Sequence, residues 1–283
     1  MAIIERGRLG GTCVNVGCVP KKIMWNAAHI HETMAHLAPG YGFTTADPGR
    51  IDWGVLKDRR DAYINRLNGM YARNLSEVDV FEGFGRLNGQ DERSGGTRVD
   101  VAASDGSTSA SLYAPHVLIA TGGYPSIPAD VDGASELCLT SDEFFNDLST
   151  QPERVAVVGA GYIAVELAGM MATLGSDVHL FVRGQGVLRS FDTMVQDYLN
   201  ASLVERNGIN LVTESNLSRV YLDETTGKKC IELVGGDIHS GFDEVVCAIG
   251  REPLVADIGL DTVGAGGILR TTAGHVVTDE LQE

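Results

Sequence analysis

Two cysteines five positions apart, Cys13 and Cys18, are the residues whose type and spacing point most directly to chemistry. Five positions is little more than one α-helical turn, so two sulfurs at the start of a helix can meet in a disulfide. Unpaired backbone N–H groups and the positive end of the helix dipole stabilise a thiolate there, which makes such a pair reactive. The spacing predicts a redox-active dithiol. A structural disulfide or half of a zinc site are the alternatives, although no second pair at zinc-ligand spacing follows.

A nucleotide-binding turn is predicted after residues 154–158, which are apolar and β-branched like a buried parallel strand. Gly159 and Gly161 come next, Ala164 takes the third glycine position, and apolar residues then recur at helical spacing. The two glycines allow a tight turn and a close approach of the backbone to a pyrophosphate at the helix N-terminus. The predicted nucleotide contacts are Gly159, Gly161 and Ile163.

The choice of nucleotide is indicated by two arginines. The next predicted strand, 178–182, is followed by Arg183, where a unit that binds NAD usually has an acidic residue for the ribose 2′-hydroxyl. Arg189 lies close by in the sequence. Two guanidinium groups can clamp the 2′-phosphate of NADP through their forked donors, so we expect NADPH. The alternative is a pair of solvated surface arginines.

Composition limits the class of partner. The formal net charge of −16 argues against nucleic acid or an anionic membrane, since both favour clustered Lys and Arg. No apolar run approaches the roughly 20 residues of a membrane-spanning helix, and no metal site is expected. Five cysteines are too few for a disulfide scaffold, so we interpret Cys138, Cys230 and Cys247 as structural thiols. We expect a soluble, cytoplasmic enzyme; an organellar form stays open, because this start does not allow a targeting peptide to be judged.

The other elements are expected to surround these two sites in an α/β fold. Helical spacing of apolar residues predicts helices over about 23–37 and 52–77. A polar stretch at 88–97 predicts a hairpin loop between short strands. Further strands are predicted at 114–123, at 245–251 and within 257–283, where Gly274 turns the chain.

Residues 10–28, GGTCVNVGCVPKKIMWNAA, closely resemble the active-site segment of the flavin-dependent pyridine nucleotide-disulfide oxidoreductases. Lys21 and Lys22 fit the relatives that act on glutathione, trypanothione or thioredoxin, and Met24 with Trp25 favours the glutathione reductases. The resemblance implies two Rossmann-like nucleotide-binding domains. The implied domains are an incomplete FAD-binding domain over 1–122, a complete NADPH-binding domain over 123–253, and the start of a returning central domain over 254–283.

The resemblance also implies FAD and NADPH as cofactors, glutathione disulfide as substrate, and a homodimer. Cys18 would lie beside the flavin, and Cys13 would form the mixed disulfide with glutathione. Lys21 and Glu166 would form an ion pair near the flavin's reactive nitrogen. Tyr162 would lie over the flavin until NADPH displaces it; the alternative for Tyr162 is a hydrophobic cap of its helix. The further implied cofactor contacts are Glu5, Thr12, Thr121, Gly122, Gly123, Gly250 and Arg251. The implied substrate contacts are Tyr63, Met70 and Tyr71, which helical spacing alone would place in a core.

The chain also departs from the family's pattern. The resemblance implies a GxGxxG turn ahead of the paired cysteines, and later a glycine-aspartate flavin motif and a His-Pro-Thr histidine; none of these occurs here. We therefore expect an internal part of a longer glutathione reductase-like enzyme. Two alternatives stay open: a relative that reduces trypanothione or thioredoxin, and an inactive fragment that only binds NADP.

Overall fold

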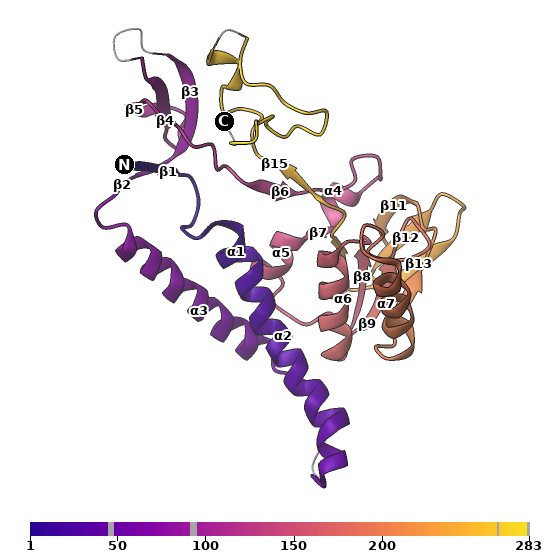
Figure 1. The fold of residues 1–283 in the computed structure, drawn as a ribbon. Helices are drawn as coiled ribbons and strands as arrows, with labels where there is room; N and C mark the ends of the chain where they lie inside the picture. The colour runs from indigo at the N-terminus through magenta and orange to yellow at the C-terminus, as the bar shows by residue number, and fades with distance from the viewer. Residues whose placement is uncertain (45–47, 91–94, 265, 282–283) are drawn as a thin grey trace. The chain divides into compact units, whose positions relative to one another are not determined.

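The computed structural model describes the chain apart from residues 45–47, 91–94, 265 and 282–283, and it divides into two compact units (Figure 1). The first unit comprises residues 1–15, 64–124 and 251–283, and the second comprises 16–63 and 125–250. Residues 16–63, which the resemblance placed in the flavin domain, group with residues 125–250 because α2 packs against α6.

The second unit is built on a five-stranded parallel sheet in the order β10, β9, β8, β14, β7. Its strands are β7 (Leu139–Thr140), β8 (Arg154–Val158), β9 (Asp177–Phe181), β10 (Asn210–Val212) and β14 (Glu244–Cys247). All but the first residue of β8 and of β9 are buried, as expected for strands covered on both faces. The predicted strand at 154–158 is confirmed, and that at 178–182 begins and ends one residue earlier.

Helices and a small antiparallel sheet bury this parallel sheet. One apolar cluster joins it to α6 and α2, and a second joins it to β11, β12 and β13. The helices are α2 (Cys18–Glu32), α4 (Ala134–Leu137), α5 (Ser141–Asn146), α6 (Tyr162–Thr173) and α7 (Thr193–Glu205), with a π-helical turn at Thr33–Leu37 and a 3-10 turn at Ala38–Tyr41. The small sheet comprises β11 (Leu217–Leu222), β12 (Lys229–Leu233) and β13 (Ile238–Phe242). The predicted helix at 23–37 begins earlier, at Cys18, since Pro20 is tolerated in a first turn.

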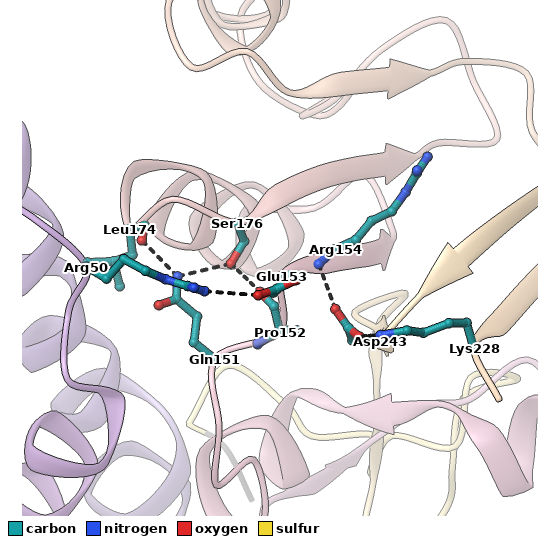
Figure 2. A network of polar contacts seen from close by, with 9 residues as sticks. All are labelled: Arg50, Gln151, Pro152, Glu153, Arg154, Leu174, Ser176, Lys228 and Asp243. Atoms are coloured by element: carbon teal, nitrogen blue, oxygen red, sulfur yellow. Dashed lines mark hydrogen bonds and ion pairs between the residues drawn. The ribbon is translucent and has the colours of Figure 1, made fainter. Parts of the chain in front are cut away.

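A network of polar contacts holds the segment that leads into β8 (Figure 2). The backbone N–H of Arg154 donates to Asp243 (2.8 Å), whose carboxylate also pairs with Lys228. The Ser176 hydroxyl donates to the carbonyl of Pro152 (2.7 Å). These bonds fix the amino-terminal ends of β8 and β9. The network therefore lies at the edge of the sheet opposite the carboxyl ends of the strands, where ligands of parallel sheets bind.

The long helix α3 (Trp53–Asn74) confirms the helix predicted at 52–77 with slightly shorter ends. The Trp53 indole N–H donates to the Leu148 carbonyl (3.2 Å). Arg60 is fully buried and donates to the Phe145 carbonyl (2.6 Å). The first half of α3 is thus anchored within the second unit.

The described residues of the first unit form three small sheets. Its elements are β1 (Ala2–Glu5) paired in parallel with β2 (Asp79–Glu82); the antiparallel β3 (Phe84–Gln90), β4 (Thr97–Ala102) and β5 (Thr108–Ala114); β6 (Gly123–Pro125) with β15 (Arg251–Pro253); α1 (Gly11–Val16); and a 3-10 turn at Leu260–Thr262. Strands β3 and β4 flank the predicted hairpin at 88–97, although β3 continues to Gln90 and residues 91–94 lie outside the described residues.

Three strand predictions need correction. Residues 116–122 form no regular structure, and Leu118 is 89% exposed, because no described strand pairs with this segment to hold its backbone extended. In the described part of 257–283, an isolated bridge between Arg270 and Val276 replaces the expected strands. The strand predicted at 245–251 ends at Cys247, and Arg251 begins β15.

Candidate active site

Cys13 in α1 and Cys18 at the start of α2 are disulfide-bonded, and both are exposed to solvent. The other three cysteines are buried free thiols. The hydrogen bond with Cys138, together with burial, raises the pKa of the Cys247 thiol far above its usual range, so Cys247 is a poor nucleophile. The accessible sulfur chemistry of the chain is therefore at Cys13 and Cys18.

The structure brings Lys21 and Glu166 together from positions 145 residues apart, with Nζ and Oε1 separated by 3.0 Å. Lys21 lies on α2 one turn after Cys18, and Glu166 lies on α6, the helix that follows the glycine turn. Their side chains are 30% and 38% exposed, so the pair contributes at most about 1 kcal/mol to stability. Both residues line a cavity of about 320 Å³ bordered by α2, α6 and α7. The pair thus ties α2, at whose start Cys18 lies, to α6, the helix that follows the glycine turn.

The glycine turn lies at the carboxyl ends of neighbouring strands β8 and β14. Gly159 has φ +145°, and a Cβ there would lie 2.3 Å from the Ala248 carbonyl oxygen. The same Cβ would come within 3.2 Å of the Ala164 Cβ, and Ala164 is fully buried. This close packing of strand, turn and helix explains glycine at 159 and alanine at 164.

Gly161 is the N-cap of α6, and a Cβ there would meet no atom within 4 Å. The first bond of the helix runs from the Val165 N–H to the Gly161 carbonyl (3.1 Å), so the N–H groups of the first turn have no intrahelical acceptor. Tyr162 is 59% exposed beside them. The turn offers the open, positively polarised backbone that a pyrophosphate requires.

The loop after β9 presents both predicted arginines to solvent. Arg183 and Arg189 are exposed and make no ion pair with any residue that the structure describes. The loop itself is fixed: the Leu188 N–H donates to the carbonyl of Ala160 in the glycine turn (2.7 Å). Leu188 is buried and has φ +55°, a backbone conformation that branched side chains rarely adopt. The surrounding structure therefore holds this residue in place against backbone strain. The residue directly before Arg189 is therefore hydrogen-bonded to the glycine turn.

Three of the implied cofactor contacts in the first unit come together. Arg251 donates to the Gly123 carbonyl (2.6 Å) and lies 3.4 Å from the Thr12 hydroxyl. A Cβ at Gly123 would lie 2.6 Å from the Glu252 carbonyl, so the pairing of β6 with β15 already requires glycine there. The Glu5 carboxylate accepts the Gly7 N–H (2.8 Å). Thr121 and Gly122 lie in the exposed irregular segment, and Gly250, which ends the second unit, is exposed.

The three implied substrate residues lie on α3, and their side chains are exposed: Tyr63, Met70 and Tyr71. They are therefore not core residues, which helical spacing alone would have suggested. Their role as substrate contacts stays a prediction. Sequence reasoning missed the buried Asn15, which lies between the cysteines in the sequence, and its partner Asn68 on α3, 53 positions away. The only local signal was that a residue between the two cysteines has an amide side chain.

The sequence matches the family described as Pyridine nucleotide-disulphide oxidoreductase over residues 1–283, and the chain belongs to this family. It is 43% identical to the glutathione reductase of Schizosaccharomyces pombe over 283 residues, covering 100% of this chain and 58% of the relative. It is also 43% identical to the Yarrowia lipolytica enzyme of the same name, covering 99% of this chain and 59% of that one. The chain thus spans somewhat more than half the length of these curated relatives.

Solved structures agree on the fold. The crystal structure of LpdA from Mycobacterium tuberculosis superposes with a TM-score of 0.84 at 24% identity, over 99% of this chain and 58% of that one. The flavoprotein disulfide reductase RclA from Escherichia coli gives a TM-score of 0.81 at 22% identity, over 98% and 56%. Among the described residues, no helix combines the length and apolar character needed to cross a bilayer.

Proposed function

We propose that the protein carrying this chain is an NADPH-dependent flavoprotein that reduces glutathione disulfide to glutathione through Cys13 and Cys18. One observation carries the proposal: an exposed disulfide ends at the start of α2, one turn before Lys21, which pairs with Glu166 on the nucleotide-binding helix. The names of the relatives with 42–43% identity support glutathione disulfide as the substrate.

NADPH fits the residues of the second unit. The pyrophosphate would lie on the N-terminus of α6 at Gly161, and Arg183 and Arg189 would bind the 2′-phosphate. Neither arginine is engaged by an acidic residue among those described, so their donors are available to a phosphate. Tyr162, which is 59% exposed at the start of α6, would lie over the flavin until NADPH displaces it.

FAD would contact Glu5, Thr12, Thr121, Gly122, Gly123 and Arg251, and the bonds that join Thr12, Gly123 and Arg251 support a shared site. When bound, FAD would accept a hydride from NADPH and deliver the electron pair to the disulfide. Lys21 would place a fixed positive charge next to Cys18, where it would favour the thiolate.

On the protein side, the disulfide exchange needs only the sulfurs of Cys13 and Cys18. After reduction, the Cys13 thiolate attacks one sulfur of glutathione disulfide, forms a mixed disulfide and releases one glutathione thiolate, which takes up a proton. The Cys18 thiolate then attacks the Cys13 sulfur, releases the second glutathione and restores the Cys13–Cys18 bond. Exposed sulfurs are required for both steps, and both cysteines are exposed. We also propose a homodimer in the cytoplasm.

A Cys13→Ser variant tests this proposal in the flavin-loaded protein. Reduction of glutathione disulfide should be lost, while NADPH-dependent reduction of ferricyanide should persist, because electron entry precedes thiol chemistry. Cys230→Ala, at a buried free thiol, is the matched control and should keep both activities. Glutathione disulfide turnover by Cys13→Ser would refute the assignment, and a preference for trypanothione disulfide in the wild type would select another substrate.

A further inference from the structure

Asn15 lies between the two cysteines in the sequence, and it is only 7% exposed. Its Nδ2 donates to the Gly11 carbonyl (2.9 Å) and lies 3.3 Å from the carbonyls of both Arg8 and Leu9. One side-chain amide thus contacts the segment that leads into α1, the six-residue helix that carries Cys13.

A second amide completes the arrangement. Asn68 on α3 donates from Nδ2 to Asn15 Oδ1 (3.0 Å) and to the Leu9 carbonyl (2.7 Å). We call Asn15 and Asn68 the amide clamp. Both residues and all their acceptors belong to the first unit, so the clamp is complete within one compact body.

The segment that the clamp holds contains two glycines. Gly10 and Gly11 precede Cys13 with φ +101° and +57°, and glycines gain more conformational freedom on release than other residues. An asparagine inside a short helix does not favour the helix by its own propensity. The Asn15 side chain is buried and hydrogen-bonded at both Nδ2 and Oδ1. It therefore positions the segment before α1 rather than stabilising the helix itself.

We propose that the amide clamp positions Cys13 and thereby sets the reduction potential of the Cys13–Cys18 disulfide. Cys18 follows the clamped Asn15 by only three residues in the chain. When the bond opens, a clamped Cys13 segment therefore limits how far the two sulfurs can separate, so the effective concentration for ring closure stays high. A high effective concentration favours the disulfide and makes the reduction potential more negative. Releasing the clamp lets Cys13 move away, which favours the dithiol. Asn15 and Asn68 are thus positioning residues that act through Cys13.

The inference rests on the redox-active disulfide of the proposed function, but not on NADPH or glutathione. It is measured by exchange with dithiothreitol: the two thiols of dithiothreitol become its cyclic disulfide, while the Cys13–Cys18 bond breaks and each sulfur gains a proton. The protein is equilibrated at fixed ratios of reduced to oxidised dithiothreitol and quenched with an alkylating reagent. The fraction of doubly alkylated Cys13–Cys18 peptide is then read by mass spectrometry.

Asn15→Ala and Asn68→Ala should each shift the exchange equilibrium about tenfold toward the dithiol, which corresponds to a potential about 30 mV less negative. Asn74→Ala is the matched control, because Asn74 is an exposed asparagine at the end of the same helix. Its equilibrium should stay within twofold of the wild type. If Asn15→Ala does not fold, Asn68→Ala decides, since it leaves the bonds of Asn15 to Gly11, Arg8 and Leu9 in place.

A purely structural clamp would give a different result. It would lower the melting temperatures of the oxidised and reduced forms equally and leave the exchange equilibrium within twofold of the wild type, which would overturn the proposal. An equal shift in Asn74→Ala would also overturn it. Failure of the proposed function has a separate signature: the clamp variants shift the equilibrium as expected, but the wild type passes no electrons to glutathione disulfide.

Discussion

Substitution by alanine should have different effects at two glycines of the same turn, Gly159 and Gly161. At Gly159 the methyl group would overlap the Ala248 carbonyl oxygen at 2.3 Å, on a backbone with φ +145°. At Gly161 the methyl group would meet no atom within 4 Å. The first substitution should therefore damage folding and the second should damage ligand binding, because the open space above Gly161 is where the pyrophosphate would lie.

The magnitudes follow from these contacts. Gly159→Ala combines backbone strain of about 1–3 kcal/mol with overpacking of about 1–3 kcal/mol, a large part of a typical domain's stability. At about 2–4 °C per kcal/mol, we expect a melting temperature lower by about 4–24 °C. Gly161→Ala should change the free energy of unfolding by less than about 1 kcal/mol. Loss of one backbone bond to a charged phosphate, about 1.5–3 kcal/mol, should weaken NADPH binding by about 10–150-fold.

Thermal unfolding by circular dichroism and NADPH titration by calorimetry separate the two effects. The reasoning is refuted if Gly159→Ala melts like the wild type, or if Gly161→Ala binds NADPH with wild-type affinity. It is also refuted if both variants lose the same amount of stability.

Three further predictions concern charge and exposure. Arg183→Ala should weaken NADPH binding by about 10–150-fold and leave NADH binding unchanged, whereas Arg59→Ala on α3 should change neither; equal losses for both nucleotides would exclude recognition of the 2′-phosphate. Burial and the neighbouring Arg154 lower the pKa of His179, so the folded state binds fewer protons than the unfolded state. Stability should fall as the pH drops below about 6.5 toward the folded-state pKa, and a His179→Gln variant should show a flatter pH dependence of melting; an unchanged slope would contradict this. After reduction, the two cysteines of the disulfide should alkylate rapidly and the three buried thiols only on unfolding, as followed by mass spectrometry; rapid labelling of a buried thiol would contradict the assigned burial.

The elements that could be predicted from sequence are those fixed by adjacent residues. The order of β-branched residues, two glycines and a periodic helix is local, and the structure has β8, the turn at Gly159 and α6 where that order predicts them. Arg183 could be singled out because its place after a strand is also local. The disulfide and the start of α2 follow from the spacing of Cys13 and Cys18.

The elements that could not be predicted depend on distant partners. Residues 116–122 have the composition of a buried strand, but a strand also requires neighbours that pair with it, and none is described here. Asn15 meets Asn68 across 53 positions, a separation that no periodicity reveals. The pairing of Lys21 with Glu166 was available only from the family resemblance, since neither residue is unusual on its own helix.

The central claim is that electrons from NADPH pass through Cys13 and Cys18 to glutathione disulfide. The most direct measurement maps free thiols by mass spectrometry in the flavin-loaded protein, first after anaerobic NADPH and then after glutathione disulfide is added. We predict that NADPH produces two new thiols, at Cys13 and Cys18 alone, and that glutathione disulfide removes both and yields two glutathione molecules per disulfide. A disulfide that NADPH leaves intact, or thiols that glutathione disulfide does not reoxidise, would contradict the account.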